Sequence, residues 1–361
     1  MRVGIVLNYI RHDSTYAALK SAETIRNLGY SVSFYDKAHK SSKANLHNYW
    51  DDFILSSKEI PFDDWVKECS VIVWFCYPTP KEVKYLKKEG KPSICLLTWD
   101  SVDSDIIEAV KNLDVLLCPS KAQKTYFENQ WHLNSTDYLP LNCNVPFFNN
   151  EYSSKEGLRI VIACPGYQIK RIDSTKLFEV LHEAAQLIPN LHLEFLHSSK
   201  VASQIKVNFT KYEKSFDNGS SLYGVDDPTG WSEGPLAYAL CDAVLWPVQI
   251  ESYGYVALEA LSMGTPVIAY NFPPMSEIIT DQKNGFLIPC ETKDTDLGVK
   301  YPIHNSKGII DVIGRLASDP SLISKTKALA HKGLDNRIQV NRLVWQTTID
   351  GLVGKDKSDG V

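Results

Sequence analysis

Short apolar runs rich in β-branched residues alternate along this chain with stretches of helical periodicity. The first series reads RVGIVLNY, then TYAALKSAETIRNLGY, then SVSFYD. Two parallel strands need a crossover between them, and the crossover is usually a helix. Three further strand-like runs, VIVWFCY, SICLLTW and VLLCPS, follow in the same half, with a helix expected at residues 121–130. The alternation therefore predicts an α/β fold built on a parallel sheet.

A second series of the same kind begins after FFNNEYSSKEG, a polar stretch without periodicity that suits a linker. It opens with LRIVIACPG, DSTKLFEVLHEAAQLI and LHLEFLHS, and it ends with GPLAYALC, AVLWPV and PVIAY. Between these parts, SFDNGSSLYGVDDPTG is predicted to be a surface loop. This break in the pattern places a domain boundary near residue 150.

The length of the chain supports two domains. A chain of 361 residues exceeds the size at which single cores usually stop growing. We expect two doubly wound domains, residues 1–150 and 151–335, followed by a last helix within 336–361. Ligands of such domains bind at the carboxyl ends of the strands, which here would face the cleft between the domains.

Composition excludes several classes of protein. No run of about 18 apolar residues exists, and the N-terminus MRVGIVLNYIRHDSTY has no cleavage-site pattern, so we expect a cytoplasmic protein without a membrane span or signal peptide. The net charge of −5 argues against binding nucleic acid or membrane by bulk electrostatics. The eight cysteines include no CxxC pair, and several lie in apolar runs, which predicts reduced thiols in the core.

Two carboxylates eight positions apart flank a glycine turn in ESYGYVALEALSMGTPVIAY. Gly254 lets the backbone approach a ligand, and N–H groups near Tyr253 and Tyr255, at the start of the expected helix, can face an anion. A carboxylate accepts hydrogen bonds from vicinal hydroxyls, so Glu251 can hold a hexose and Glu259 a ribose, with a diphosphate between them. The alternative is that one Glu favours a helix start and the other lies on the helix surface.

This segment, continued by PPMSEIITDQKNGFLIP, resembles the E-x7-E donor site of retaining GT-B glycosyltransferases of the group 1 type. The resemblance runs through Gly264, Pro266, Glu277 and Gly285. It implies a GT-B fold, in which two Rossmann-like domains face a central cleft and the last helix crosses back to the first domain. It also implies transfer of a hexose from a UDP-, GDP- or ADP-sugar to an acceptor hydroxyl, with retention of anomeric configuration and no further cofactor.

Breaking a sugar–diphosphate bond builds negative charge on the leaving phosphate, which cations can stabilise. The segment GYQIKRID places Lys170 and Arg171 between an expected strand and helix, at the carboxyl end of the sheet. With Gly166, this segment is similar to the phosphate-gripping element of the same family. It departs from the family in having Tyr167 directly after the glycine, where an Arg is usual, and in a shorter spacing from the glycine to Lys170.

Two residues of the first domain are also candidates. The strand end LLTWDS places Trp99 and Asp100 where relatives have a substrate-contacting His. Asp100 can accept a hydrogen bond from an acceptor hydroxyl and Trp99 can stack on a sugar; a helix N-cap and a structural Trp are the alternatives. The loop NYIRHDSTY lacks the glycines that the family often has there, which leaves its role open.

Other patterns bear on metals and partners. No His or Cys set has metal spacing, so we expect catalysis without a metal. The run KEVKYLKKEGK can present Lys81, Lys84 and Lys88 to an anionic acceptor or membrane surface, which would make the protein peripheral at a membrane; a solvated helix face is the alternative.

Three other functions remain open on the sequence. A glycosyltransferase acting on hydroxylated bases in DNA would share the donor site but need a basic cleft. An epimerase or phosphorylase on this fold would need its own carboxylates or a pyridoxal phosphate lysine. A noncatalytic nucleotide-sugar-binding or scaffold protein is disfavoured, because both signature carboxylates are present.

Overall fold

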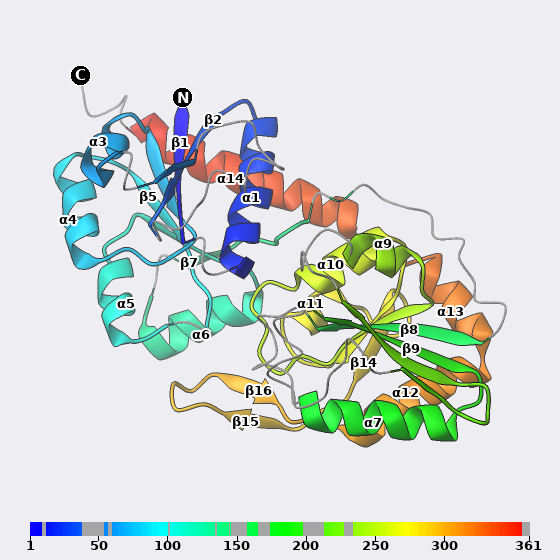
Figure 1. The fold of residues 1–361 in the computed structure, drawn as a ribbon. Coiled ribbons are helices and arrows are strands. Elements are labelled where there is room, and N and C mark those ends of the chain that lie inside the picture. The colour runs from blue at the N-terminus through cyan, green and yellow to red at the C-terminus, as the bar shows by residue number, and fades with distance from the viewer. Residues whose placement is uncertain are drawn as a thin grey trace. The chain divides into compact units, whose positions relative to one another are not determined.

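The computed structural model describes residues 1–8, 12–37, 54–56, 60–99, 102–133, 136–143, 145, 157–164, 174–197, 213–226 and 234–355. The chain forms two compact units, one of Met1–Asn144 with Asn336–Val361 and one of Val145–Asp335 (Figure 1). The chain first passes from one unit to the other between Asn144 and Val145, next to the boundary near residue 150 that the linker sequence predicts. The segment that starts at Asn336 clusters with the first unit rather than the second.

The first unit is built on a parallel sheet with the strand order β3-β2-β1-β4-β5-β6-β7 over the described residues. Its strands are β1 (Arg2–Leu7), β2 (Ser31–Asp36), β3 (Ile54–Ser56), β4 (Val71–Trp74), β5 (Ser93–Leu96), β6 (Val115–Cys118) and β7 (Thr136–Tyr138). The strands β4 and β5 are buried along their whole length, because helices cover both faces of the sheet.

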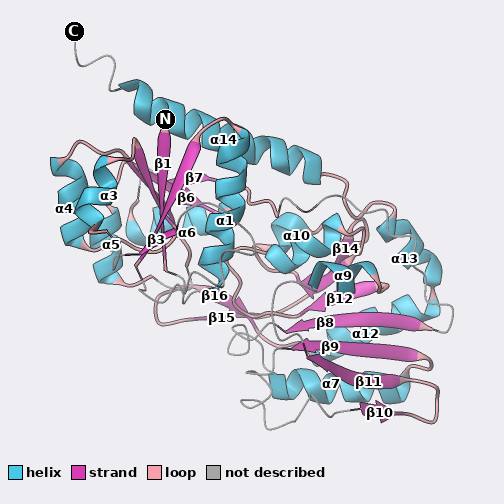
Figure 2. Cartoon of the chain, turned by 45° about the horizontal axis from the view of Figure 1, so that its top comes forward, coloured by secondary structure: helices cyan, strands magenta, loops and turns pink. Residues whose placement is uncertain are grey.

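The helices of this unit follow the crossovers that the sequence predicts. They are α1 (His12–Asn27), α3 (Phe62–Lys67), α4 (Pro80–Lys88), α5 (Ser104–Val110), α6 (Lys121–Trp131) and the last helix α14 (Leu334–Lys355). Figures 1 and 2 show α1 on one side of the sheet and α3, α4 and α5 on the other. The helix α14 is tied to this unit by hydrogen bonds from Arg337 Nε to Leu141 O (2.6 Å) and from Asn341 Nδ2 to Pro140 O (2.9 Å).

The second unit repeats this design, with the strand order β10-β11-β9-β8-β12-β13-β14 over the described residues. Its strands are β8 (Leu158–Cys164), β9 (Leu191–His197), β10 (Glu213–Ser215), β11 (Ser221–Asp226), β12 (Ala243–Trp246), β13 (Val267–Tyr270) and β14 (Gly285–Ile288). All neighbours in this order are parallel except β10 and β11. A separate hairpin joins β15 (Thr292–Asp294) to β16 (Lys300–Pro302).

Helices cover both faces of this second sheet as well. They are α7 (Ser174–Leu187), α9 (Gly234–Ala239), α10 (Tyr255–Ser262), α11 (Met275–Ile278), α12 (Ser306–Ser318) and α13 (Pro320–Lys327). In both views α7 and α12 lie on one side of the sheet and α9 and α10 on the other (Figure 2). The strand order reverses direction between β8 and β12, so the carboxyl ends of these two strands define the ligand crevice expected of such a sheet.

The predicted α/β fold with two Rossmann-like domains is confirmed, and one local prediction is wrong. The stretch SFDNGSSLYGVDDPTG was expected to be a surface loop, but it contains β11, which pairs with β9 from Ser221 opposite His192 to Asp226 opposite His197. The short run SLYGVD carries a Gly and polar residues, so its own strand signal is weak, and the pairing with β9 decides its conformation.

The cysteine prediction is confirmed where side chains are described. Seven cysteines are free thiols, and all except the half-buried Cys290 are buried. Burial raises the pKa of Cys69 and that of Cys241 to about 12, so these thiols stay protonated at neutral pH. None of the described helices combines the length and apolar character needed to cross a lipid bilayer.

Candidate functional site

The two carboxylates of the predicted donor site lie on either side of the start of α10. Glu251 follows β12, and Glu259 lies in the second turn of α10. Both are buried, with 6% of Glu251 and 7% of Glu259 exposed. Every residue of α10 is buried, so Glu259 does not occupy an ordinary helix surface. Burial of two carboxylates is costly unless partners satisfy them, which is typical of a functional site rather than of a solvated helix.

Glu251 is held by four N–H donors. Its Oε1 accepts hydrogen bonds from the backbone N–H groups of Ser252 (2.9 Å), Tyr253 (2.9 Å) and Gly254 (3.1 Å). Its Oε2 accepts a hydrogen bond from the indole Nε1 of Trp246 at 3.2 Å. Carboxylate oxygens accept such hydrogen bonds, so this arrangement fixes the orientation of the Glu251 side chain.

The same hydrogen bonds involve part of the turn that the sequence predicts to face an anion. The N–H groups of Tyr253 and Gly254 donate to the carboxylate of Glu251 in this structure. That N–H groups near Tyr253 and Tyr255 face a ligand anion stays a prediction. Three consecutive backbone N–H groups that converge on one point form an anion-binding site, and here they hold the Glu251 carboxylate. At the start of α10, the N-cap residue is Gly254, so no side chain of that residue caps the first backbone N–H groups of the helix.

Gly254 has the backbone conformation that its place in the turn requires. It is the N-cap of α10 with φ of 79°, in the left-handed region that favours glycine. A Cβ atom there would clash with Ile278 Cδ1 and lie 3.1 Å from Met275 Cε, both on α11. Close packing against α11 therefore sets the path of the turn between Glu251 and α10.

The tyrosines on either side of Gly254 pack against each other. Tyr253 and Tyr255 are buried, and their rings stack with centroids 5.9 Å apart and an angle of 24° between planes. Stacking of these two rings stabilises the conformation of the turn between them.

The predicted phosphate-binding residues lie outside the described part of the chain. These are Gly166, Lys170 and Arg171, in the connection from β8 to α7. The strand β8 pairs with β12, with Ile160 opposite Ala243 and Ile162 opposite Leu245. The connection after β8 and the turn after β12, which holds Glu251, therefore start from adjacent carboxyl ends at the point where the strand order reverses.

Asp100 of the first unit also lies outside the described residues, and the structure decides the role of two of its neighbours. Asp103 caps α5, since its side chain accepts a hydrogen bond from the backbone N–H of Ile106 at 2.9 Å. The N-cap of α5 is therefore Asp103, and the role of Asp100 stays a prediction. Trp99 is buried with its ring edge-on to Tyr126 at 6.3 Å between centroids, which is the packing of a structural Trp.

Sequence reasoning missed Trp246. This residue ends β12, is fully buried, and donates a side-chain hydrogen bond from its indole to Glu251. Its position five residues before Glu251, at the carboxyl end of a buried strand, was the available signal. In the described part of the chain, no three His, Cys, Asp or Glu side chains gather as ligands for a metal ion.

Comparison with known proteins gives a family match that covers this site. Residues 229–300 match the family Glycosyl transferases group 1. A D-inositol 3-phosphate glycosyltransferase of Saccharomonospora viridis is 29% identical over 136 residues, which cover 36% of this chain and 27% of that protein. An uncharacterized glycosyltransferase of Haemophilus influenzae is 24% identical over 193 residues, covering 53% of this chain and 51% of that protein. The chain thus spans about half the length of these relatives or less.

Similarity of fold extends over nearly the whole chain. The Anabaena protein HepE, solved in complex with UDP and glucose, superposes with a TM-score of 0.66 at 13% identity, covering 96% of this chain and 99% of that one. At this level of identity the likeness establishes the fold. The chain has the GT-B fold of two Rossmann-like units, and the part of it that carries Glu251 and Glu259 matches the Glycosyl transferases group 1 family.

Proposed function

We propose that this protein transfers a hexose from a nucleoside-diphosphate sugar to an acceptor hydroxyl, with retention of anomeric configuration. The observation that carries this proposal is the buried carboxylate of Glu251, which four N–H donors hold in one orientation beside the start of α10. A surface Glu gains nothing from such a set of donors. A carboxylate that must accept hydrogen bonds from sugar hydroxyls gains a fixed orientation from it.

The proposed roles follow the chemistry of each group. Glu251 accepts from the hydroxyls of the donor hexose, and Glu259 accepts from the ribose hydroxyls. The diphosphate meets the start of α10 at Tyr255 and the cations Lys170 and Arg171, with Gly166 opening that segment. In the first unit, Asp100 accepts a hydrogen bond from the acceptor hydroxyl.

In the proposed reaction, the bond between the anomeric carbon and the phosphate oxygen breaks while the acceptor oxygen bonds to the same face of that carbon. The departing phosphate oxygen takes the proton of the acceptor hydroxyl, so the products are the glycoside and a nucleoside diphosphate. Lys170 and Arg171 stabilise the charge that grows on the phosphate. We propose that these cations replace a divalent metal ion in this role.

The proposal is tested first by binding and then by turnover. Thermal unfolding is measured with UDP-, GDP- and ADP-sugars; a donor at 100 times its Kd adds about 2.7 kcal/mol of stability. UDP-sugars come first in this screen, because the structures of HepE contain UDP, UDP-glucose or UDP with glucose. Failure of every nucleotide sugar to stabilise the protein would overturn the donor assignment.

Turnover with the bound donor then tests the chemistry. We expect the anomeric configuration of the product, read from its NMR coupling constants, to equal that of the donor. We also expect EDTA to leave turnover unchanged. An inverted product would exclude the proposed front-side reaction, and loss of activity in EDTA that a divalent ion restores would identify a metal site.

A further inference from the structure

A β-hairpin follows the last strand of the second sheet. It pairs β15 with β16, from Thr292 opposite Pro302 to Asp294 opposite Lys300, and it stands apart from that sheet (Figure 1). The strands β12, β13 and β14 run parallel, so their carboxyl ends lie at one edge of the sheet. The chain leaves β14 for the hairpin at this edge, and Glu251 follows β12 at the same edge.

The hairpin is bound to the connection that carries Glu251. Gln249 Nε2, two residues before Glu251, donates a hydrogen bond to the backbone carbonyl of Pro302 at 3.2 Å. Pro302 ends β16 and is buried. Residues 247–254 belong to neither a helix nor a strand, so no regular ladder of backbone hydrogen bonds sets their path. The hydrogen bond from Gln249 therefore helps to set the position of the Glu251 backbone.

A second anchor lies on the neighbouring strand β13. Tyr270 ends this strand and is only 1% exposed. Its hydroxyl accepts a hydrogen bond from the backbone N–H of Asn305 at 3.3 Å and forms another with Nδ1 of His304 at 3.0 Å. Residues 302–305, which we call the brace, are thus bonded both to the end of β13 and, through Gln249, to the connection after β12.

Glu259 is positioned in a different way. It lies in the second turn of α10, where the hydrogen bonds of the helix set its place. The brace is bonded to the connection before α10, in which Glu251 lies. A displacement of the brace would therefore move Glu251 relative to Glu259.

We propose that the β15–β16 hairpin, acting through the brace and Gln249, determines which hexose the site accepts. The inference rests on the proposed function, in which Glu251 accepts hydrogen bonds from hydroxyls of the donor hexose. Epimeric hexoses differ in the direction of one hydroxyl, and a hydrogen bond weakens steeply as its angle becomes less linear. A carboxylate held in one place discriminates between such epimers, whereas one that shifts with its backbone accepts both. Gln249 is thus a positioning residue for Glu251.

The test measures donor binding to the full chain by calorimetry, so it needs no acceptor. The ligands are the glucose, galactose and mannose donors of the nucleotide that the thermal screen selects, and the nucleoside diphosphate alone. Gln249→Met keeps the length of the side chain and removes its Nε2 donor. We expect the ratio of Kd values between the weakest and the tightest hexose donor to fall about fivefold, the scale of one hydrogen bond. The Kd of the nucleoside diphosphate should stay the same, because Glu259 and α10 are intact.

Tyr270→Phe tests the brace independently. It removes the hydroxyl that holds His304 and Asn305, so it should lower the same ratio of Kd values. The double variant Gln249→Met/Tyr270→Phe should lower the ratio no further than the stronger single variant, because both substitutions release one element. Additive losses would mean that the two residues act separately, and they would overturn the role of the brace.

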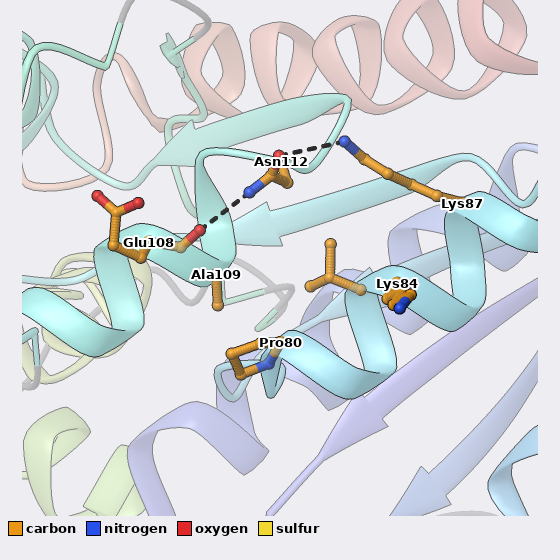
Figure 3. A pocket seen from close by; sticks show the side chains of 7 residues that line it. Pro80, Lys84, Lys87, Glu108, Ala109 and Asn112 are labelled. Carbon is orange, nitrogen blue, oxygen red and sulfur yellow. Dashed lines mark hydrogen bonds between the residues drawn. The ribbon is translucent and has the colours of Figure 1, made fainter.

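Asn112→Leu is the matched control in the first unit. Asn112 Nδ2 also donates to a backbone carbonyl, that of Glu108 at 3.0 Å, beside the hollow between α4 and α5 (Figure 3). This variant should bind every donor as the unchanged protein does, and circular dichroism establishes that all variants are folded.

The outcomes separate this inference from the proposed function. An equal fall of the ratio in Asn112→Leu, an unchanged ratio in Gln249→Met, or equal affinity of the unchanged protein for all three hexose donors would overturn the role of the hairpin alone. If no nucleotide sugar binds to the unchanged protein, the proposed function fails and the inference fails with it.

Discussion

The indole Nε1–H of Trp246 donates a hydrogen bond to Oε2 of Glu251 over 3.2 Å, across the turn that connects β12 to α10. The backbone N–H groups of the turn hold the other oxygen, so Trp246 is what fixes the rotation of the carboxylate from the side of the strand. A positioning role for Trp246 in the proposed reaction follows from this geometry.

Trp246→Phe should lower kcat by roughly tenfold to a hundredfold, because a hydrogen bond to a charged group contributes about 1.5 to 3 kcal/mol. Nucleotide affinity should change less, since Glu259 is intact. Trp65→Phe is the matched control: Trp65 is also fully buried, but its Nε1 donates to Ser33 Oγ at 2.9 Å in the first unit. Both variants should lose stability, and a similar loss of kcat in both would refute the positioning role.

The two carboxylates should respond differently to removal. Glu259→Ala should weaken nucleotide binding about tenfold to a hundredfold with or without the sugar, whereas Glu251→Ala should chiefly lower kcat and the discrimination between sugars. Calorimetry with the nucleoside diphosphate and with the full donor separates these effects. Glu291→Ala, at an exposed position, is the control. Negligible effects of both site substitutions would remove the donor-site assignment.

Lys170→Ala should lower kcat by roughly a hundredfold, the scale seen when one group that stabilises transition-state charge is lost. Donor affinity should fall less, because the charge on the phosphate grows only as the bond breaks. Lys170→Arg should keep little of the original kcat, since a planar guanidinium does not reproduce a compact ammonium group. Lys176→Ala, an exposed position in the first turn of α7, serves as control. Normal kcat for Lys170→Ala would falsify its proposed role.

Gly254→Ala should destabilise the second unit and disturb the turn that holds Glu251. The left-handed φ of 79° costs an Ala about 1 to 2 kcal/mol, and displacing Ile278 adds about 1 to 3 kcal/mol. Gly333→Ala is the control, because Gly333 has φ of 95° but nothing lies within 4 Å of its added Cβ. Urea unfolding should show a larger loss for Gly254→Ala; equal losses would mean that packing against α11 does not matter.

Stability should depend on pH through Lys327, which pairs with Asp242 at 3.4 Å; their side chains are 9% and 6% exposed. Burial lowers the pKa of Lys327 below its ordinary 10.5, although Asp242 opposes this. Between the lowered pKa and 10.5 the unfolded chain binds more protons, so stability rises with pH across that window. Below the lowered pKa, the cost of burying the charge is fully present.

Lys327→Met should therefore flatten this rise in urea unfolding series at increasing pH, while Lys325→Met, at an exposed position on the same helix, should leave it unchanged. Asp242→Asn leaves the ammonium group buried without its counter-charge and should cost about 3 kcal/mol at neutral pH. An unchanged slope in Lys327→Met would show that another group controls the alkaline behaviour.

The sequence alone determined the alternation of strands and helices, the two-unit organisation and the place of Glu251 and Glu259 around α10. These features have local signals: apolar runs, helical spacing, and a glycine turn between two carboxylates. The tertiary structure decided that SLYGVD becomes β11, since β9 supplies its partner, and that Asp103 caps α5. It also joined Trp246 to Glu251 and formed the hollow between α4 and α5. Such contacts depend on how segments pack against one another in three dimensions. The periodicity of a single segment does not specify that packing.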